Sequence, residues 1–449
     1  MYLGHLDRIE MACARASFGV CVIACASVSC GGSSATRVGT DAGGGSHGDA
    51  GSGVFVEAPH APFPRLVFPG GPILVAPKIV TVTFAGDSNA DALEAFGDDI
   101  VTSSWWTTVT AGFCDQSGTC IGKGSSGGHV RIPTAPAASY SDSTVGTTSS
   151  LQMFILDQLN QGVFPANTPN TLYLLYLPGS TVITLTESSG QSVTTCTQFS
   201  GYHNAITVGE PTPVSYAVIQ ECLPPAGSPL TPFEVLTSTA SHEIVEGATD
   251  PLPTGQPRGY ALDPTDPVSL PWALFAGAEA GDLCVDPMAL GQDVTRVDGY
   301  SAQRIWSNAN AAKGLDPCIP LPDRAVYFSV APEGTNGFLV LRVGGTATFM
   351  ADAFSTAATG PWTLTGVDWA TKTHLLKAPL LSFFFNGQAS ATVQNGDKVS
   401  VTVSLNADPS QLGSAVGVFL SSTGPANAPT AAHTWPILVV TPSEYDGGL

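Results

Sequence analysis

The segment 231–251, TPFEVLTSTASHEIVEGATDP, carries the clearest helix signals in the chain. Thr231 suits the N-cap position, a proline follows at the first helical position, and Glu234 completes a capping box three residues after the cap. Gly247 and Pro251 are typical of a helix end. The sequence therefore predicts a helix whose last turns contain HEIVE.

His242 and Glu246 lie four residues apart, so a helix presents both on one face, where they can bind one cation. The familiar zinc motif HExxH has a second histidine at the position of Glu246, but Zn²⁺ also accepts a carboxylate oxygen. The added negative charge weakens the Lewis acidity of the cation and favours harder ions. Glu243 lies beside this pair, and we predict that it is the general base that takes a proton from a water activated by the cation.

A catalytic metal site needs a third protein ligand. The segment AGAEAGDLC offers Glu279 and Asp282, with Cys284 fixing the loop, and Glu279 is the preferred candidate. Asp250 falls on the same helix face but after the expected helix end. His203, in SGYHNA, is a further candidate as a ligand or as a donor to the transition state. Two other interpretations remain open: an ordinary acidic helix end, and a structural calcium site formed by the acidic loops.

Upstream of this helix, strand-like and helix-like patterns alternate. Together with the HE-bearing helix they predict an α+β domain over residues 61–322. The expected strands are 78–84, 129–132, 171–179, 203–209 and 215–220, and the expected helices are 89–106 and 148–162.

From about Arg324 onward, short alternating runs such as KVSVTVSL are separated by turn signals, including Asn395-Gly396, about every ten residues. This texture predicts an all-β immunoglobulin-like sandwich over residues 323–449. The sandwich contains no cysteine and no cluster of catalytic residue types.

Residues 1–30 have the composition of a secretory leader, with Arg15 before a short apolar run and small residues around Cys30. The Gly- and Ser-rich segment 31–60 is typical of a flexible linker. We predict lipidation at Cys30, with Cys25 as the second candidate and simple secretion as the alternative. The protein is therefore expected outside the cytoplasm, in contact with a membrane only through a lipid anchor.

Six cysteines follow the leader, and an even number in an exported chain favours disulfides. Sequence proximity favours the pairs Cys114–Cys120, Cys196–Cys222 and Cys284–Cys318. The formal net charge of −20, with only 16 Lys plus Arg, argues against nucleic-acid binding, which needs a basic surface.

Several motifs resemble known families. PGGPIL, KIVTVTF, LYLLYLPG and the GYHNA that follows Cys196 resemble the exordium-like, phosphate-induced family of secreted plant proteins. SHEIVEGATDP, EAGDLC and IWSNANAAKGLDPC resemble bacterial exported proteins with the pattern SHExxExxTDP, ExGDxC and WSN before a last cysteine. The similarity covers about 70–320 and leaves the C-terminal sandwich unmatched.

The bacterial set implies a zincin-like fold and a metallopeptidase. The plant set implies cell-wall or growth-related roles without known catalysis. We therefore expect an exported metal-dependent peptide hydrolase, with Zn²⁺ as cofactor and Ca²⁺ as the alternative ion. The competing hypothesis is a non-catalytic, exordium-like surface protein that binds polysaccharide or protein.

Overall fold

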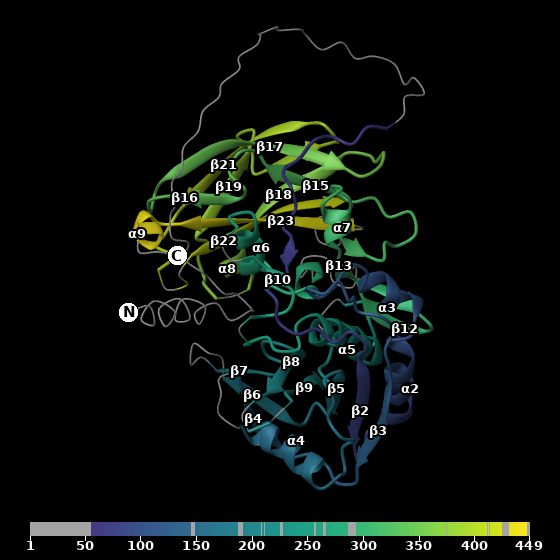
Figure 1. Ribbon diagram of the computed structural model, residues 1–449. Coiled ribbons are helices and arrows are strands. Elements are labelled where there is room, and N and C mark those ends of the chain that lie inside the picture. The colour runs from purple at the N-terminus through teal and green to yellow at the C-terminus, as the bar shows by residue number, and fades with distance from the viewer. Residues whose placement is uncertain are drawn as a thin grey trace.

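The computed structural model describes residues 55–446, except 145–148, 187–191, 208, 211, 225–227, 256, 264–265, 286–292, 374, 411, 413 and 424–430. The predicted leader and its lipidation site at Cys30 lie outside these residues. In the described part, no helix is long and apolar enough to cross a membrane. Figure 1 shows an α/β domain below and an all-β domain above.

The α/β domain is built on a five-stranded sheet of order β3-β2-β5-β9-β8. Four of the strands are parallel, and β8, at the edge, runs antiparallel to β9. The strands are β2 (Lys78–Phe84), β3 (Ser125–Ile132), β5 (Thr171–Leu177), β8 (Gly201–Ile206) and β9 (Val214–Gln220).

Helices cover both faces of this sheet, because its strands carry apolar side chains on both sides. On one face, Leu172 and Leu174 share a core with residues of α2 (Ala90–Ile100) and α5 (Pro232–Thr249). On the other face, Tyr173 and Leu175 share a core with residues of α4 (Ser150–Asn160).

Smaller elements complete the α/β domain. A three-stranded sheet consists of β4 (Ser139–Ser143), β6 (Val182–Thr186) and β7 (Ser192–Thr194). Three strand pairs are β1 (Leu66–Val67) with β10 (Ala261–Leu262), β11 (Val294–Val297) with β12 (Tyr300–Gln303), and β13 (Ile305–Trp306) with β14 (Cys318–Ile319). The short helices are α3 (Ser104–Val109), α6 (Ser269–Phe275), η1 (Asp282–Cys284) and α7 (Asn308–Ala311).

The second domain is a sandwich of a four-stranded and a five-stranded sheet, of order β15-β17-β21-β19 and β16-β23-β22-β18-β20. This corresponds to the A-B-E-D and A′-G-F-C orders of the immunoglobulin sandwich, with β20 beside the C position, so the sandwich prediction is confirmed. Its elements are β15 (Phe328–Pro332), β16 (Phe338–Val340), β17 (Thr346–Ser355), β18 (Trp362–Asp368), α8 (Trp369–Lys372), β19 (Leu381–Phe385), β20 (Ser390–Val393), β21 (Lys398–Leu405), β22 (Ala415–Thr423), β23 (Ala431–Val440) and α9 (Pro442–Asp446).

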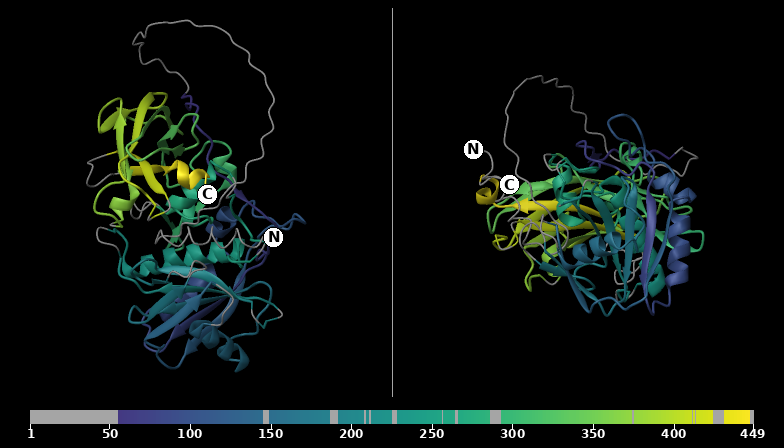
Figure 2. Two further views of the ribbon diagram at one scale, coloured as in Figure 1. Left: turned by 90° about the vertical axis from the view of Figure 1, so that its left-hand side faces the viewer. Right: turned by 60° about the horizontal axis from the view of Figure 1, so that its bottom comes forward.

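The two domains share one apolar core. Trp272 of α6 contacts Trp306 at 5.5 Å and Trp435 of β23 at 5.4 Å between ring centroids. Phe63, just after the expected linker, lies among the same rings, and His60 stacks on Phe354 at 3.6 Å. The side view in Figure 2 shows the sandwich resting on the α/β domain, and this aromatic contact joins them.

Two local expectations need correction. The helix expected over 89–106 is two helices, α2 and α3, because Ser103 takes an extended conformation and caps α3 by accepting from Trp106 N. Gly247 does not end α5, which continues to Thr249. A Cβ at Gly247 would lie 3.1 Å from a Leu172 methyl carbon, so the glycine lets α5 pack closely on β5.

All three predicted disulfide pairs are formed: Cys114–Cys120, Cys196–Cys222 and Cys284–Cys318. Disulfides persist in oxidising environments, so these three favour a location outside the cytoplasm.

Candidate metal centre

Helix α5 supplies three of the predicted site residues. Its start is the expected capping box, in which Thr231 Oγ1 accepts from Glu234 N and Glu234 Oε2 accepts from Thr231 N. His242, Glu243 and Glu246 follow in the last turns. The Glu243 and Glu246 side chains are 5% and 3% exposed, so both carboxylates lie in the interior, where charge must be compensated.

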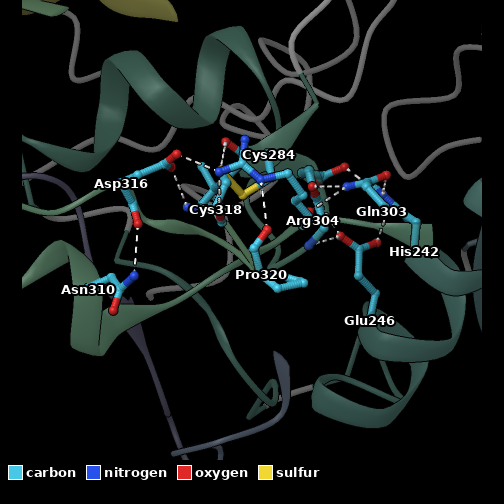
Figure 3. The surroundings of a disulfide bond; sticks show 12 residues. His242, Glu246, Cys284, Gln303, Arg304, Asn310, Asp316, Cys318 and Pro320 are labelled. Carbon is cyan, nitrogen blue, oxygen red and sulfur yellow. Dashed lines mark hydrogen bonds and ion pairs between the residues drawn. A yellow bond between two sulfur atoms is a disulfide. The ribbon is translucent and has the colours of Figure 1, made fainter. Parts of the chain in front are cut away.

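The two oxygens of Glu246 have different partners. Oε1 accepts hydrogen bonds from the backbone N–H groups of Gly281 at 2.9 Å and Asp282 at 3.0 Å. Oε2 lies 3.0 Å from Nε2 of His242. Figure 3 shows His242, Glu246 and Gln303 beside the disulfide Cys284–Cys318. Glu246 therefore fixes the loop before η1 with one oxygen and faces His242 with the other.

Gln303 determines which nitrogen of His242 is available. Its Nε2 donates to the carbonyl oxygen of Gly281 at 2.6 Å, so its Oε1 is the atom that faces Nδ1 of His242, at 2.9 Å. Nδ1–H therefore donates to Gln303, which leaves Nε2 as the ring nitrogen that faces Glu246. An outer hydrogen bond of this kind orients a metal-binding histidine. The sequence analysis missed Gln303, because 61 residues separate it from His242.

His203 approaches the same carboxylates from β8. Its Nε2 donates to the carbonyl oxygen of Asp250 at 3.1 Å, which leaves Nδ1 as the ring nitrogen that faces the carboxylates. Nδ1 lies 3.5 Å from Oε2 of Glu243 and 3.7 Å from Oε2 of Glu246. The edge strand thus contributes a second imidazole to the cluster.

Arg258 provides the cationic side chain of this neighbourhood. Its Nε donates to Asp250 Oδ2 at 2.8 Å, and its Nη2 forms an ion pair with Glu279 Oε1. Asp250 also accepts from Gly259 N and is fully buried. Because its oxygens are used in this way, Asp250 lies outside both groups of potential ligands, unlike the prediction. Arg258 was missed; the scarcity of cations in this chain was the available signal.

Two groups of three side chains bring one donor atom each within 4.8 Å of one another. His242, Glu246 and Asp282 form the first group, and His203, Glu246 and Glu279 form the second. The predicted set of His242, Glu246 and Glu279 is not one of these groups. Asp282 takes the place beside His242, whereas Glu279 lies with His203.

Glycine keeps the backbone close to the donors. A Cβ at Gly281 would lie 2.6 Å from Nδ1 of His242 and 2.9 Å from Oε1 of Glu246. A Cβ at Gly201 would lie 2.9 Å from Oε1 of Glu243, whose Oε2 is buried without a hydrogen bond. The imidazole and carboxylate donors and this unbonded oxygen fit a divalent cation of the zinc type.

The pKa values follow from burial and mutual attraction. Burial opposes protonation of His203, but Glu279 and the neighbouring carboxylates raise its pKa to about 10. Burial also opposes protonation of His242. Nearby carboxylates, chiefly that of Glu246, nevertheless raise the pKa of His242 well above its ordinary value. Burial acts against ionisation of Glu246, yet His242 lowers its pKa to about 2. Burial and Glu246 raise the pKa of Asp282 to about 7. Protons on the imidazoles thus compensate the carboxylates, and a bound cation would displace them.

The cluster is most accessible at Asp282, whose side chain is 29% exposed, against 12% for His242. A cavity of about 470 Å³ lies nearby at the domain junction, lined by residues that include Leu283, Cys284 and Trp306. Its lining includes none of the donor side chains.

No known family model matches this chain, and no curated protein matches it. Among solved structures, domain 1 of VCBP3 from Branchiostoma floridae aligns with 27% of this chain and 98% of that chain, at 9% identity and a TM-score of 0.18. We base no statement about fold or function on this similarity.

Proposed function

We propose that the protein is an exported, zinc-dependent peptide hydrolase with a zincin-like α/β domain. The observation that carries the proposal is the convergence of the His242, Glu246 and Asp282 donors beside Glu243, whose Oε2 is buried without a hydrogen bond. The resemblance of SHEIVEGATDP and EAGDLC to bacterial exported zincin-like proteins supports it.

His242, Glu246 and Asp282 would hold the cation. A Zn²⁺ bound by them would supply Lewis acidity that polarises a carbonyl and acidifies water. Gln303 keeps His242 in the tautomer that such binding needs, and the backbone N–H groups of Gly281 and Asp282 keep Glu246 oriented.

Glu243 is suited to the role of general base. It lies next to His242 on α5, and its Oε1 is 3.9 Å from His242 Nε2. Its Oε2 has no hydrogen bond that would compete for a proton. Glu243 would accept the proton of the attacking water and pass it to the leaving amine, as a general base and then acid.

The edge strand β8 supports a peptide as substrate. It is the last strand of the sheet, next to β9, and it carries His203 of the cluster. An extended peptide can add to an exposed sheet edge through backbone hydrogen bonds. A peptide bound along β8 would pass beside the cluster.

The test is Glu243→Gln, which preserves shape and removes the base. We expect zinc content and thermal stability to stay the same while cleavage of an unfolded protein substrate falls by roughly a hundredfold or more. Glu221→Gln, outside the cluster at the end of β9, is the matched control and should cleave normally.

Zinc-loaded protein that cleaves no peptide would contradict the proposal and favour the non-catalytic surface protein. A Glu243→Gln variant as active as the unmodified protein would exclude Glu243 as the base.

A further inference from the structure

The carboxylate of Glu246 belongs to both groups of potential ligands. Its Oε2 lies 3.0 Å from Nε2 of His242 and 3.7 Å from Nδ1 of His203. These imidazoles come from α5 and from β8, and each has its other ring nitrogen bonded elsewhere, to Gln303 and to the Asp250 carbonyl. One oxygen therefore faces two separate nitrogen donors, and these two nitrogens belong to different groups of potential ligands.

The carboxylates around Glu246 Oε2 also face the two imidazoles separately. Oε1 of Glu279 forms an ion pair with Arg258, and Oε2 of Glu279 lies 3.8 Å from Nε2 of His203. Oε1 of Glu246 accepts hydrogen bonds from two backbone N–H groups. Asp282 Oδ1 lies 3.7 Å from Nε2 of His242. Each imidazole thus has its own carboxylate partner, and Glu246 Oε2 is common to both.

The cluster holds more carboxylates than cationic side chains. Its carboxylates are those of Glu243, Glu246, Asp250, Glu279 and Asp282, and its guanidinium is that of Arg258. With neutral imidazoles and all five carboxylates ionised, five negative charges would face one positive charge. Two divalent cations would balance these charges, whereas one would leave a net charge of −2. Buried charges that remain unpaired are strongly unfavourable.

Glu243 adds a further buried carboxylate oxygen on the His203 side of the cluster. Its side chain is 5% exposed, and its Oε2 has no hydrogen bond although it points to within 3.5 Å of Nδ1 of His203. Its Oε1 faces His242 at 3.9 Å. A cation bound at His203 would place a positive charge beside this buried carboxylate oxygen.

We infer that the cluster is a two-cation centre in which Oε2 of Glu246 is the bridging ligand. His242 and Asp282 hold one cation, and His203 and Glu279 hold the other. The nitrogen and oxygen donors suit Zn²⁺ or Mn²⁺. This inference deepens the proposed function and rests on it for the first cation, and paired metal ions are a known arrangement for hydrolysis.

The test is the metal stoichiometry of the purified full chain, measured by elemental analysis after loading with Zn²⁺ and removal of the excess. We expect two Zn²⁺ per unmodified chain and one in His203→Ala and in Asp282→Asn. Glu246→Ala should retain none in stoichiometric amount. His129→Ala, on β3 and outside the cluster, is the control and should retain two.

Electron paramagnetic resonance of Mn²⁺-loaded unmodified protein provides a test without mutation. A bridged pair should give an exchange-coupled spectrum, and isolated ions should not. One Zn²⁺ per chain, still present in His203→Ala, would overturn the inference.

The two proposals fail in different ways. Peptide cleavage with a single cation refutes the two-cation centre and leaves the proposed function standing. Two bound cations without peptide cleavage refute the proposed function and leave the two-cation centre standing.

Discussion

The α/β domain and the sandwich differ in what they bury. In the α/β domain, His203, Glu243, Glu246 and Asp250 are all less than a tenth exposed. Among the described residues of the sandwich, the buried charged side chain is Asp368, which caps α8 and accepts from Thr371 N. The sandwich core is otherwise apolar, with small polar residues among it. The two domains therefore differ in the charge that they bury.

This difference separates stability from chemistry. Ionised groups lose hydration on burial, and replacing them by apolar residues often stabilises a protein. A domain that retains five carboxylates around two imidazoles is therefore less stable than its fold allows. Such clusters, with displaced pKa values, are typical of functional sites. The sandwich contains no comparable cluster among its described residues, so we assign the chemistry to the α/β domain.

The ion pairs of the two domains give the sharpest test of this contrast. Arg258 joins Asp250 and Glu279 in the interior, and Lys398 joins Glu333 and Asp352 on the sandwich surface, with its side chain 56% exposed. Arg258→Met leaves buried carboxylates without their cation and should lower the free energy of unfolding of metal-free protein by about 3 to 5 kcal/mol.

Lys398→Met, which also exchanges a cation for an apolar chain of similar length, should change it little, because water screens exposed ion pairs. Denaturant unfolding in the presence of a chelator measures both variants. Equal losses would show that the two domains do not differ in this respect.

The disulfides all belong to the α/β domain and its connection to the sandwich. Replacing Cys284 and Cys318 by serine opens a loop of sequence separation 34 and should cost about 4 kcal/mol of unfolding free energy by loop entropy. The same change at Cys114 and Cys120, with separation 6, should cost about 2 kcal/mol.

The Cys284–Cys318 variant should also bind Zn²⁺ more weakly, because the released segment carries the Asp282 ligand. Urea unfolding and zinc titration of the two double variants test this. Unchanged zinc affinity would show that the Glu246 contacts to Gly281 and Asp282 hold the loop without the disulfide.

Local signals in the sequence were sufficient for the elements that depend on near neighbours. The capping box of Thr231 and Glu234 predicted the start of α5, and short separations predicted the three disulfides. The alternation in 398–405 predicted a strand of the sandwich, which β21 confirms. These features are determined by residues close in the chain, so a sequence pattern can reveal them.

The composition of the candidate metal centre depends on distant contacts and was only partly predictable. HEIVE identified His242 and Glu246, but which acidic residue lies beside His242 depends on how the loop before η1 folds back onto α5. Arg258 neutralises part of the cluster only because it lies near Asp250 and Glu279 in space. Gly247 was misread as a helix end because its role is to pack against Leu172 on another element.

Two histidines, one from each domain, extend the comparison to pH. His433 on β23 packs against Tyr327 and Phe328 at 4.4 and 4.9 Å between ring centroids. Burial, with help from Arg304 and against the opposing effect of Asp316, lowers the pKa of His433 to about 4. In metal-free protein the pKa of His203 moves the other way, to about 10.

The signs of these shifts predict opposite effects on stability. The pKa of His433 is about 4 in the folded chain and about 6.5 in the unfolded chain. Between these pH values, His433 is protonated in the unfolded chain and neutral in the folded chain. Stability must therefore fall as the pH is lowered through this window, by at most about 3 kcal/mol from this residue. Protonated His203 instead contributes stability below about pH 6.5 that is lost as the pH rises toward 10.

His433→Phe removes the proton-binding group and keeps an aromatic ring beside Tyr327 and Phe328. The variant should lose less unfolding free energy than the unmodified protein when the pH falls from 7 to 4, because one site of preferential proton uptake by the unfolded chain is gone. Denaturant unfolding at several pH values, with a chelator present throughout, measures the two slopes. If the slopes coincide, His433 is protonated equally in both states, and the sandwich contributes no acid sensitivity through this residue. A shallower slope in the variant would show that His433 is held neutral in the folded protein, in contrast to the raised pKa of His203 in the candidate metal centre.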